Sequence, residues 1–249
     1  MNCHLRDSLY FMMMSLLFFL YPLETLAKDV IRINGSGAPL EIIKPLAEAY
    51  GKNNPNVTFE MEKPLGSSGA IKALLAGAID IAIVSRPLKP EEIEQGGKLR
   101  NYGRTPLAIV TGENVPVKNI STQELENIYS GKTAKWPNGE IIRIILRPDA
   151  DIDTKILKGL SKGMTNAVTR AKKRRGIMVA VTDPESNEAV SKTAGGVGVA
   201  GLCGILAGKS RLKLIGLNGV KPSRENLANK TYPLAKDISV VTTGKLNDA

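Results

Sequence analysis

Residues 66–86, GSSGAIKALLAGAIDIAIVSR, decide the fold of this chain. Four small residues, Gly66 to Gly69, form a turn, and an apolar segment of about two helical turns follows them over 69–76. A β-branched run, Ile79 to Val84, comes next and predicts a buried strand. A helix followed at once by such a strand is typical of an α/β protein with a largely parallel sheet.

The two ends of this segment carry polar groups suited to an anion. Ser67 and Ser68 stand at the helix start, where backbone N–H groups lack partners within the helix and attract negative charge. Ser85 and Arg86 follow the strand, at the edge where open α/β sheets bind ligands. Alternatively, Ser67 is only a helix cap and the glycines are only turn residues, so this motif alone leaves both interpretations open.

A second unit of the same kind lies nearer the N-terminus. A short strand over 31–33 leads through the turn 34–39 into a helix over 39–51, whose apolar face is formed by Leu40, Ile43, Leu46, Ala47 and Tyr50. Ser36, Gly37 and Ala38 stand at the start of this helix. Two helix N-termini can point at one cleft, and this pairing favours the interpretation as an anion site.

The rest of the chain continues the alternation of helices and β-rich runs. Ser121 with Glu124 three residues later forms a capping box, which predicts a short helix that ends near Ser130-Gly131. Further strands are expected at 57–61, 105–111, 141–146, 177–181, 197–200 and 238–242, and further helices at 91–95, 154–160, 165–175 and 184–191, with one more within 219–231.

Four segments in this order resemble the phosphate-binding proteins of ABC transporters: GSGAP at 35–39, the segment 66–88, NISTQELENIYSGKTAKWPNG at 119–139 and LRPDADIDT at 146–154. The resemblance spans nearly all of residues 29–244. It implies an α/β, two-lobed periplasmic-binding-protein fold of type II. Each lobe would be a mostly parallel sheet flanked by helices, with the ligand cleft between the lobes and hinge closure around the ligand.

The resemblance also implies how the chain divides. We expect the chain to cross between lobes near Thr105–Thr111 and again near Arg211–Leu217. Lobe I would then consist of residues 28–106 and 211–249, and lobe II of residues 107–210.

By the same resemblance, the ligand is phosphate or a similar oxyanion, and Arg147 and Thr154 in the loop after strand 141–146 join the site. With Arg86, Arg147 would place one arginine on each side of the cleft and clamp an anion. Together with the helix starts and the strand end, the expected ligand-binding residues are Ser36, Gly37, Ala38, Ser67, Ser68, Ser85, Arg86, Arg147 and Thr154.

Two departures from the family pattern bear on the ligand. Ser85 stands where phosphate binders have an aspartate that accepts the proton of monohydrogen phosphate. The family's Gly-Ser-Gly-Thr loop is replaced by a segment with Asp149, Asp151 and Asp153. These carboxylates would repel a dianion unless they face solvent or pair with Arg86 and Arg147 in a structural ion-pair network. They could also bind a cation or a ligand amine.

The N-terminus predicts export. Leu9 to Leu20 is an apolar run that follows Arg6 and precedes the small-x-small sequence Thr25-Leu26-Ala27. A bilayer requires about 20 residues, so this run suits a signal peptide over 1–27 and a periplasmic location. A retained anchor or a core helix is the alternative. Cys203 is then the only remaining cysteine, which leaves no internal disulfide.

Charge and composition narrow the function classes. The formal net charge of +10 attracts anions, and it would equally suit nucleic acid or an anionic membrane. The densest basic run, Lys172 to Arg175, has no interleaved aromatic residues, so we expect no nucleic-acid partner. The only histidine, His4, lies in the signal segment. The mature chain is therefore expected to have no catalytic histidine, no metal site and no cofactor.

A last departure concerns the C-terminus. The family continues past the strand near Asp237–Thr243 into helix that packs on the first lobe, whereas this chain ends at Ala249. Lobe I would then expose an apolar patch, which a partner or a second copy of the chain could cover by self-association.

Three classes of function remain. The leading one is a non-enzymatic periplasmic solute-binding protein that delivers phosphate or a similar oxyanion to an ABC transporter permease. The alternative is a binding or sensor module on the same fold, with another ligand or none. The third is a hydrolase or transferase that uses the acidic loop.

Overall fold

A computed structural model describes residues 29–244. The expected signal segment, residues 1–27, and the C-terminal residues 245–249 lie outside the described residues. Within the described part, no helix is both long and apolar enough to cross a membrane.

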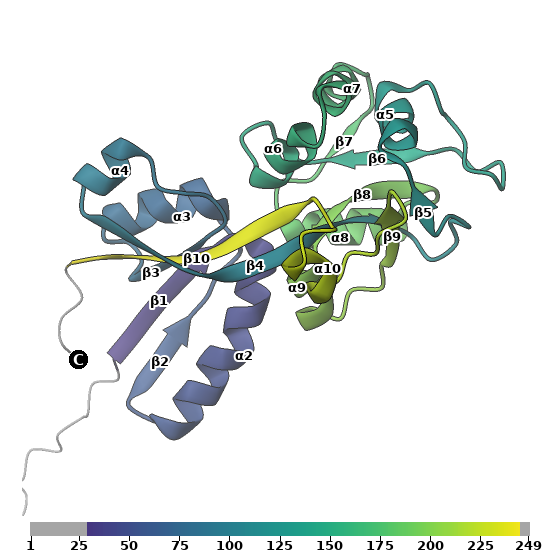
Figure 1. The fold of residues 1–249 in the computed structure, drawn as a ribbon. Coiled ribbons are helices and arrows are strands. Elements are labelled where there is room, and N and C mark those ends of the chain that lie inside the picture. The colour runs from purple at the N-terminus through teal and green to yellow at the C-terminus, as the bar shows by residue number, and fades with distance from the viewer. Residues whose placement is uncertain (1–28, 245–249) are drawn as a thin grey trace, which may run out of the picture.

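Strands and helices alternate along most of the chain (Figure 1). The strands are β1 (Asp29–Gly35), β2 (Val57–Glu60), β3 (Ile81–Val84), β4 (Gly97–Thr111), β5 (Asn119–Ile120), β6 (Arg143–Leu146), β7 (Met178–Val179), β8 (Gly196–Gly201), β9 (Lys213–Leu217) and β10 (Ala235–Thr243). The helices are α2 (Gly37–Asn53), α3 (Gly66–Leu75), α4 (Pro90–Glu94), α5 (Thr122–Ser130), α6 (Ile152–Gly159), α7 (Lys162–Lys172), α8 (Asp183–Lys192), α9 (Leu202–Ala207) and α10 (Arg224–Ala228).

Both strand–turn–helix units near the N-terminus form as the sequence predicts. β1 lies between β2 and β3 and pairs with each in parallel, in a register that places Ile33 opposite Ile81. α3 buries Ala70, Ile71 and Leu74 against β3. Parallel pairing brings the carboxyl ends of β1 and β3 to the same sheet edge, so the starts of α2 and α3 lie at one edge as well.

Two long strands connect the two halves of the molecule. β4 and β10 pair antiparallel from Ala235 opposite Pro106 to Thr243 opposite Gly97, with a register shift between Ile238 and Ser239. Figure 1 shows them running side by side from one group of helices to the other. We call β1–β3 and α2–α4 with the adjoining halves of β4 and β10 lobe I, and the remainder lobe II. The expected two-lobed α/β fold is confirmed.

Lobe II has the larger hydrophobic core. β4 continues past Pro106 and pairs there with β8 and β9, and β6 pairs with β8 and β7 in parallel. The core between this sheet and helices α5, α6 and α7 includes Leu125, Tyr129, Trp136 and Met164. Lobe I has smaller cores, which stand on either side of its own sheet.

The second crossing lies later in the chain than expected. Residues 213–217 form β9, which pairs with β4 and β5 of lobe II, and Tyr232 and Leu234 pack in the lobe II core. The chain therefore stays with lobe II beyond Arg211–Leu217 and leaves it in β10. We propose lobe boundaries of 29–104 with 236–244 for lobe I and 105–235 for lobe II.

The outer face of α2 also differs from expectation. Leu40 and Ala47 are buried as predicted, but Leu46 is 60% exposed and Tyr50 is 52% exposed. Part of the apolar face of α2 is left uncovered, because β2 contacts only the remainder of this face. A groove of about 580 Å³ lies between α2 and β2 and is lined in part by Phe59. Self-association through an apolar face of lobe I stays a prediction.

Candidate functional site

The start of α2 touches lobe II. The Gly37 N–H donates a hydrogen bond to Asp183 Oδ2 at 3.2 Å, while the N-cap residue Ser36 makes no side-chain capping bond within the described structure. A Cβ on Gly37 would lie 2.9 Å from the Asp183 Cβ and 2.9 Å from the Pro184 Cδ. The helix start approaches α8 this closely only because residue 37 is glycine.

The start of α3 is bonded to the end of β3. Ser67 Oγ accepts a hydrogen bond from the Ser85 N–H at 2.9 Å, and Ser68 Oγ accepts one from Arg86 Nε at 3.1 Å. Each serine hydroxyl thereby keeps its own hydrogen for a further acceptor. Ser85 is buried, and its Oγ finds no hydrogen-bond partner within residues 29–244. Such an orphaned hydroxyl is costly and is often explained by a functional role or an additional bound group.

Arg86 is held by a carboxylate of its own lobe. Its Nη1 and Nη2 donate to the two Glu92 oxygens at 2.8 and 2.7 Å, and Nη1 also donates to the Pro87 carbonyl. These bonds lower the pKa of Glu92, so Glu92 stays ionised and compensates the charge of Arg86. Arg86 therefore does not pair with the acidic loop, in contrast to one of the sequence-based alternatives.

A cavity of about 180 Å³ separates these groups from lobe II. From lobe I it is lined by Ser36, Ser67, Ser68 and Arg86, and from lobe II by Asp151, Lys155 and Asp183, among others. The structure thus brings four of the expected ligand-binding residues to one cavity. Its walls combine hydroxyl donors and cationic groups with two carboxylates.

Arg147 is buried and is not among the residues that line this cavity. Its Nη1 donates to the Ala180 carbonyl at 2.9 Å, and its Nη2 lies 2.8 Å from Asp151 Oδ2 and 3.5 Å from Asp183 Oδ2. The remaining expected residue of this loop, Thr154, donates from its hydroxyl to the Arg147 carbonyl at 3.1 Å. Arg147 is therefore engaged by carboxylates of its own lobe.

The three aspartates of the acidic loop have different partners. Asp149 is exposed and pairs with Lys158 at 2.9 Å and Lys172 at 2.6 Å. Asp151 caps α6 by accepting from the Asp153 N–H, in addition to its bond with Arg147. The expectation that Arg86 and Arg147 neutralise all three aspartates is thus wrong for Asp149 and Asp153.

Asp153 pairs with a lysine that the sequence did not single out. Lys236 of β10 is buried, and its Nζ lies 2.8 Å from Asp153 Oδ1 and 2.7 Å from Asp183 Oδ1. Burial opposes its charge, but both carboxylates together raise the pKa of Lys236, so it stays protonated. Burial raises the pKa of Asp153 to about 7, against the opposing charge of Lys236. Burial acts in the same direction on Asp183, but Lys236 and Arg147 outweigh it and lower the pKa of Asp183.

The sequence did not reveal Lys236 and Asp183 as site residues, because the residues around them form no pattern that indicates a buried charge. Lys236 stands in a β-rich run that resembles a strand with one solvated residue. Asp183 follows Thr182 and precedes Pro184, which is an ordinary helix start. Lys236 follows Leu234 and Ala235 but is itself followed by Asp237, so its neighbours do not distinguish it from an exposed lysine.

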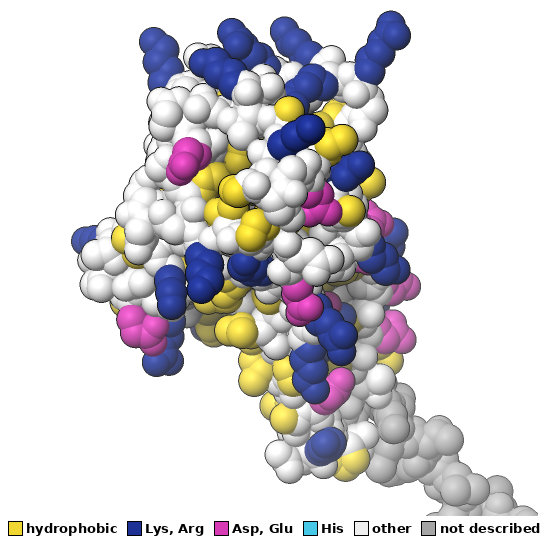
Figure 2. Space-filling view, turned by 90° about the vertical axis from the view of Figure 1, so that its right-hand side faces the viewer, with side chains coloured by type: hydrophobic (Ala, Val, Ile, Leu, Met, Phe, Trp, Pro, Cys, Tyr) yellow, Lys and Arg dark blue, Asp and Glu magenta, His cyan; other side chains and the backbone are white. Residues whose placement is uncertain are grey.

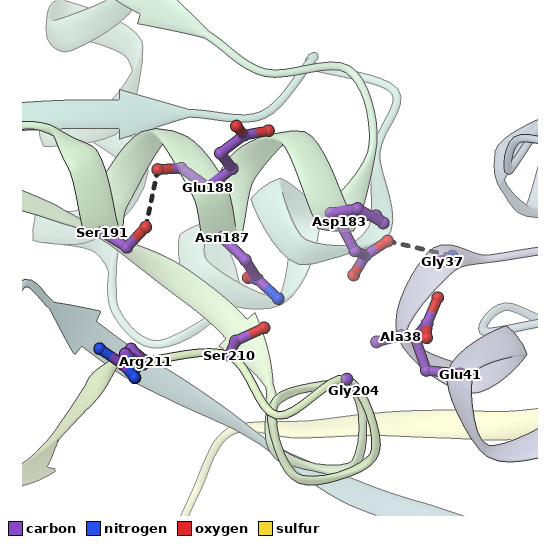
Figure 3. A pocket seen from close by; sticks show the side chains of 12 residues that line it. Gly37, Ala38, Glu41, Asp183, Asn187, Glu188, Ser191, Gly204, Ser210 and Arg211 are labelled. Atoms are coloured by element: carbon purple, nitrogen blue, oxygen red, sulfur yellow. Dashed lines mark hydrogen bonds between the residues drawn. The ribbon is translucent and has the colours of Figure 1, made fainter.

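A second cavity, of about 280 Å³, lies on the other side of Asp183. It is bounded by the start of α2, by α9 with the segment that follows it, and by one face of α8, and it is lined in part by Asn187 and Ser210 (Figure 3). Figure 3 shows the Asp183 side chain hydrogen-bonded to Gly37 at one end of this cavity. Among the described residues, no group of three or more His, Cys, Asp or Glu side chains is arranged to hold a metal ion.

Two lobes joined by a pair of long strands, with a polar cavity between them, define a two-lobed binding protein. The chain belongs to the PBP superfamily, because the model of the PBP superfamily domain matches residues 23–248.

Similar proteins include the phosphate-binding protein PstS of Borreliella burgdorferi, which is 27% identical over 89% of this chain and 81% of its own length. Protein SphX of Synechococcus elongatus is 29% identical over 89% of this chain and 71% of its own length. Among solved structures, an ABC transporter substrate-binding protein from Clostridium perfringens with bound phosphate has a TM-score of 0.71 at 22% identity and covers 88% of this chain and 89% of its own. This structural similarity concerns the fold.

Proposed function

We propose that this protein is a periplasmic solute-binding protein that captures phosphate or a similar oxyanion in the cavity between its lobes and delivers it to an ABC transporter. The residues that line this cavity are the main support for the proposal. Serine hydroxyls from the starts of α2 and α3 line it together with the cationic groups of Arg86 and Lys155. Hydroxyl hydrogens and cations are the groups that recognise a tetrahedral oxyanion.

Long-range charge supports an anionic ligand. The chain carries a formal net charge of +10, and Figure 2 shows lysine and arginine side chains projecting from the upper end of lobe II. A positive field of this kind raises the rate at which anions reach the protein.

The state of the acidic groups supports binding without catalysis. Asp151, Asp153 and Asp183 each lie within ion-pair distance of Arg147 or Lys236, so none is a free carboxylate facing the cavity. The relative from Borreliella burgdorferi is named a phosphate-binding protein, which agrees with a protein that binds and releases its ligand unchanged.

Calorimetry on protein that has been unfolded, dialysed free of anions and refolded tests this proposal. We expect phosphate to bind with a Kd of about 1 μM or lower. Sulfate, arsenate and molybdate serve as comparison ligands, since the Ser85 hydroxyl can donate a hydrogen bond to a fully deprotonated anion, whereas an ionised aspartate can only accept one. The proposal fails if none of the four anions gives heat or raises the melting temperature.

A pair of serine variants locates the binding site. Ser68→Ala removes a hydroxyl from the cavity between the α3 start and Asp151, and it should weaken phosphate binding by about tenfold, the typical effect of one hydrogen bond to a charged group. Ser210→Ala removes a hydroxyl from the second cavity and should leave the affinity unchanged. The opposite pattern would place the ligand in the second cavity.

A binding or sensor module with a different ligand is the second candidate. The observation that favours it is the pairing of Arg147 with Asp151 and Asp183, which occupies the arginine that would otherwise clamp an anion. Binding of another small molecule, with no response to any of the four oxyanions, would favour this candidate.

A further inference from the structure

Asp183 occupies a position that suits a bound anion. Its Oδ2 accepts the first backbone N–H of α2 and lies 3.5 Å from Arg147 Nη2, while its Oδ1 accepts from Lys236 Nζ at 2.7 Å. A helix N-terminus, a guanidinium and an ammonium therefore converge on one carboxylate. These donor types are the ones that bind oxyanions at protein sites.

The donors around Asp183 come from different parts of the fold. Gly37 belongs to α2 of lobe I, Arg147 follows β6 of lobe II, and Lys236 stands on β10, which passes from one lobe to the other. Asp183 itself is the first residue of α8 in lobe II. The carboxylate thus joins the two lobes in the manner that a ligand between them would.

Asp183 also lies at the boundary of both cavities. It lines the cavity that holds Ser67 and Ser68, and it lines the second cavity beside Asn187. The close approach that places it there depends on Gly37, since any side chain at residue 37 would collide with Asp183 and Pro184. The position of the carboxylate is therefore fixed by packing as well as by charge.

The charges near this carboxylate leave little attraction for an added anion. Lys236 is shared between Asp153 and Asp183, and Arg147 between Asp151 and Asp183. An oxyanion that approaches from the serine-lined cavity meets two carboxylates, and the buried cations behind them are already compensated. Of the two buried cations and the start of α2, Asp183 contacts all three, whereas Asp151 contacts only Arg147.

We propose that the Asp183 carboxylate is an internal competitor for the oxyanion position, and that it sets the affinity and specificity of the site. An incoming oxyanion takes over the Gly37 N–H and the charge of Arg147 as the Asp183 side chain withdraws. This inference rests on the proposed function, because it concerns the same ligand class and the same cavity.

The test compares Asp183→Asn with the control Asp149→Asn. Asparagine carries no charge, and its one carbonyl oxygen can accept from either Lys236 or Gly37 but not from both, because these two donors bond different oxygens of Asp183. We expect Asp183→Asn to bind phosphate at least about tenfold more tightly than the wild type, because one buried like charge is removed. Asp149 is 67% exposed and paired with two lysines, so Asp149→Asn should leave the affinity nearly unchanged.

The outcomes separate this inference from the proposed function. Equal or weaker phosphate binding by Asp183→Asn, with clear binding by the wild type, overturns the inference and leaves the proposed function intact. Binding by Asp183→Asn without binding by the wild type supports the inference and removes phosphate capture as the wild-type function. If phosphate affinity rises equally in Asp183→Asn and Asp149→Asn, the proposed role of Asp183 is overturned, because the increase would then reflect only the change in net charge. Asp183→Ser provides a second neutral variant if the asparagine protein does not fold.

Discussion

At the residue scale, Asp153 is a carboxyl group whose ionisation the fold changes. Its side chain is 1% exposed and lies beside Lys236 at the point where β10 passes between the lobes. Removal from water favours the neutral form, and this effect exceeds the attraction of the lysine, so the pKa of Asp153 is raised to about 7. An unfolded chain would release this proton near pH 3.9, about the usual value for aspartate.

This difference predicts a pH-dependent stability. Between about pH 4 and pH 7, the folded protein holds a proton on Asp153 that the unfolded chain has lost, so stability falls as the pH rises through this range. The free energy of unfolding should fall by about 1.4 kcal/mol per pH unit relative to Asp153→Asn, which lacks the titrating group. Urea unfolding at several pH values measures the difference.

The control for this experiment is Asp149→Asn. Lys172 and Lys158 lower the pKa of Asp149, so its titration lies below the range in question and has the opposite sign. If Asp149→Asn and Asp153→Asn change the pH profile equally, Asp153 is not the responsible group.

The serines that line the cavity between the lobes show what sequence can supply at this scale. Ser36, Ser67 and Ser68 were identified because local patterns, helix starts rich in glycine and serine, mark them. Lys236 and Asp183 are 53 positions apart in sequence, and only the folded chain brings them to 2.7 Å. A local pattern carries no information about such a pair.

At the scale of single elements, α5 was predicted most completely. Ser121 Oγ accepts from the Glu124 N–H, and the Glu124 carboxylate accepts from the Ser121 N–H at 2.7 Å, as the capping box implies. The helix ends at Gly131, which adopts a left-handed conformation with φ of 84°. Both ends of this helix are specified by neighbouring residues, which is why sequence alone located it.

The cap should contribute measurably to stability. We expect Ser121→Ala to lower the free energy of unfolding by about 1 kcal/mol, because the Glu124 N–H loses its acceptor at the helix start. Gln123→Ala is the matched control on the same helix turn, since Gln123 bonds only to the Asn127 side chain. Denaturant titration of both variants tests the prediction, and equal losses would show that the cap has no specific effect.

Other elements depended on tertiary contacts and were missed. α9 has six residues, and the third, Gly204, allows Ala38 of α2 to approach so closely that a Cβ on residue 204 would lie 2.8 Å from the Ala38 Cα. β9 pairs with the end of β4 that lies in lobe II. The sequence of 202–217 shows neither a clear helical period nor a capping signal, so its structure follows from the partners it contacts.

At the scale of the whole molecule, the contact between α2 and α9 is a seam between the lobes. Cys203 stands at this seam, where its N–H donates to Thr105 Oγ1, and burial raises the pKa of its thiol. A thiol with a raised pKa reacts slowly while it is covered. We expect separation of α2 from α9 to increase the exposure of this thiol.

This arrangement predicts that ligand binding protects the thiol. In a Cys3→Ser chain, where Cys203 is the only cysteine, saturating phosphate should slow the reaction with a thiol reagent by about threefold or more, because it favours the closed lobes. Labelling rates followed by mass spectrometry measure this effect. A rate that does not respond to phosphate, in protein shown by calorimetry to bind it, would mean that the seam does not open.

The chain has a single tryptophan, Trp136, and its indole Nε1 donates to the Gly195 carbonyl at 3.0 Å inside the core of lobe II. Lobe I has cores of its own that contain no tryptophan. Intrinsic tryptophan fluorescence therefore reports on the unfolding of lobe II, and it does not respond to unfolding that is confined to lobe I. Circular dichroism sums over both lobes. The two optical signals together can therefore distinguish unfolding of one half of the molecule from unfolding of the whole.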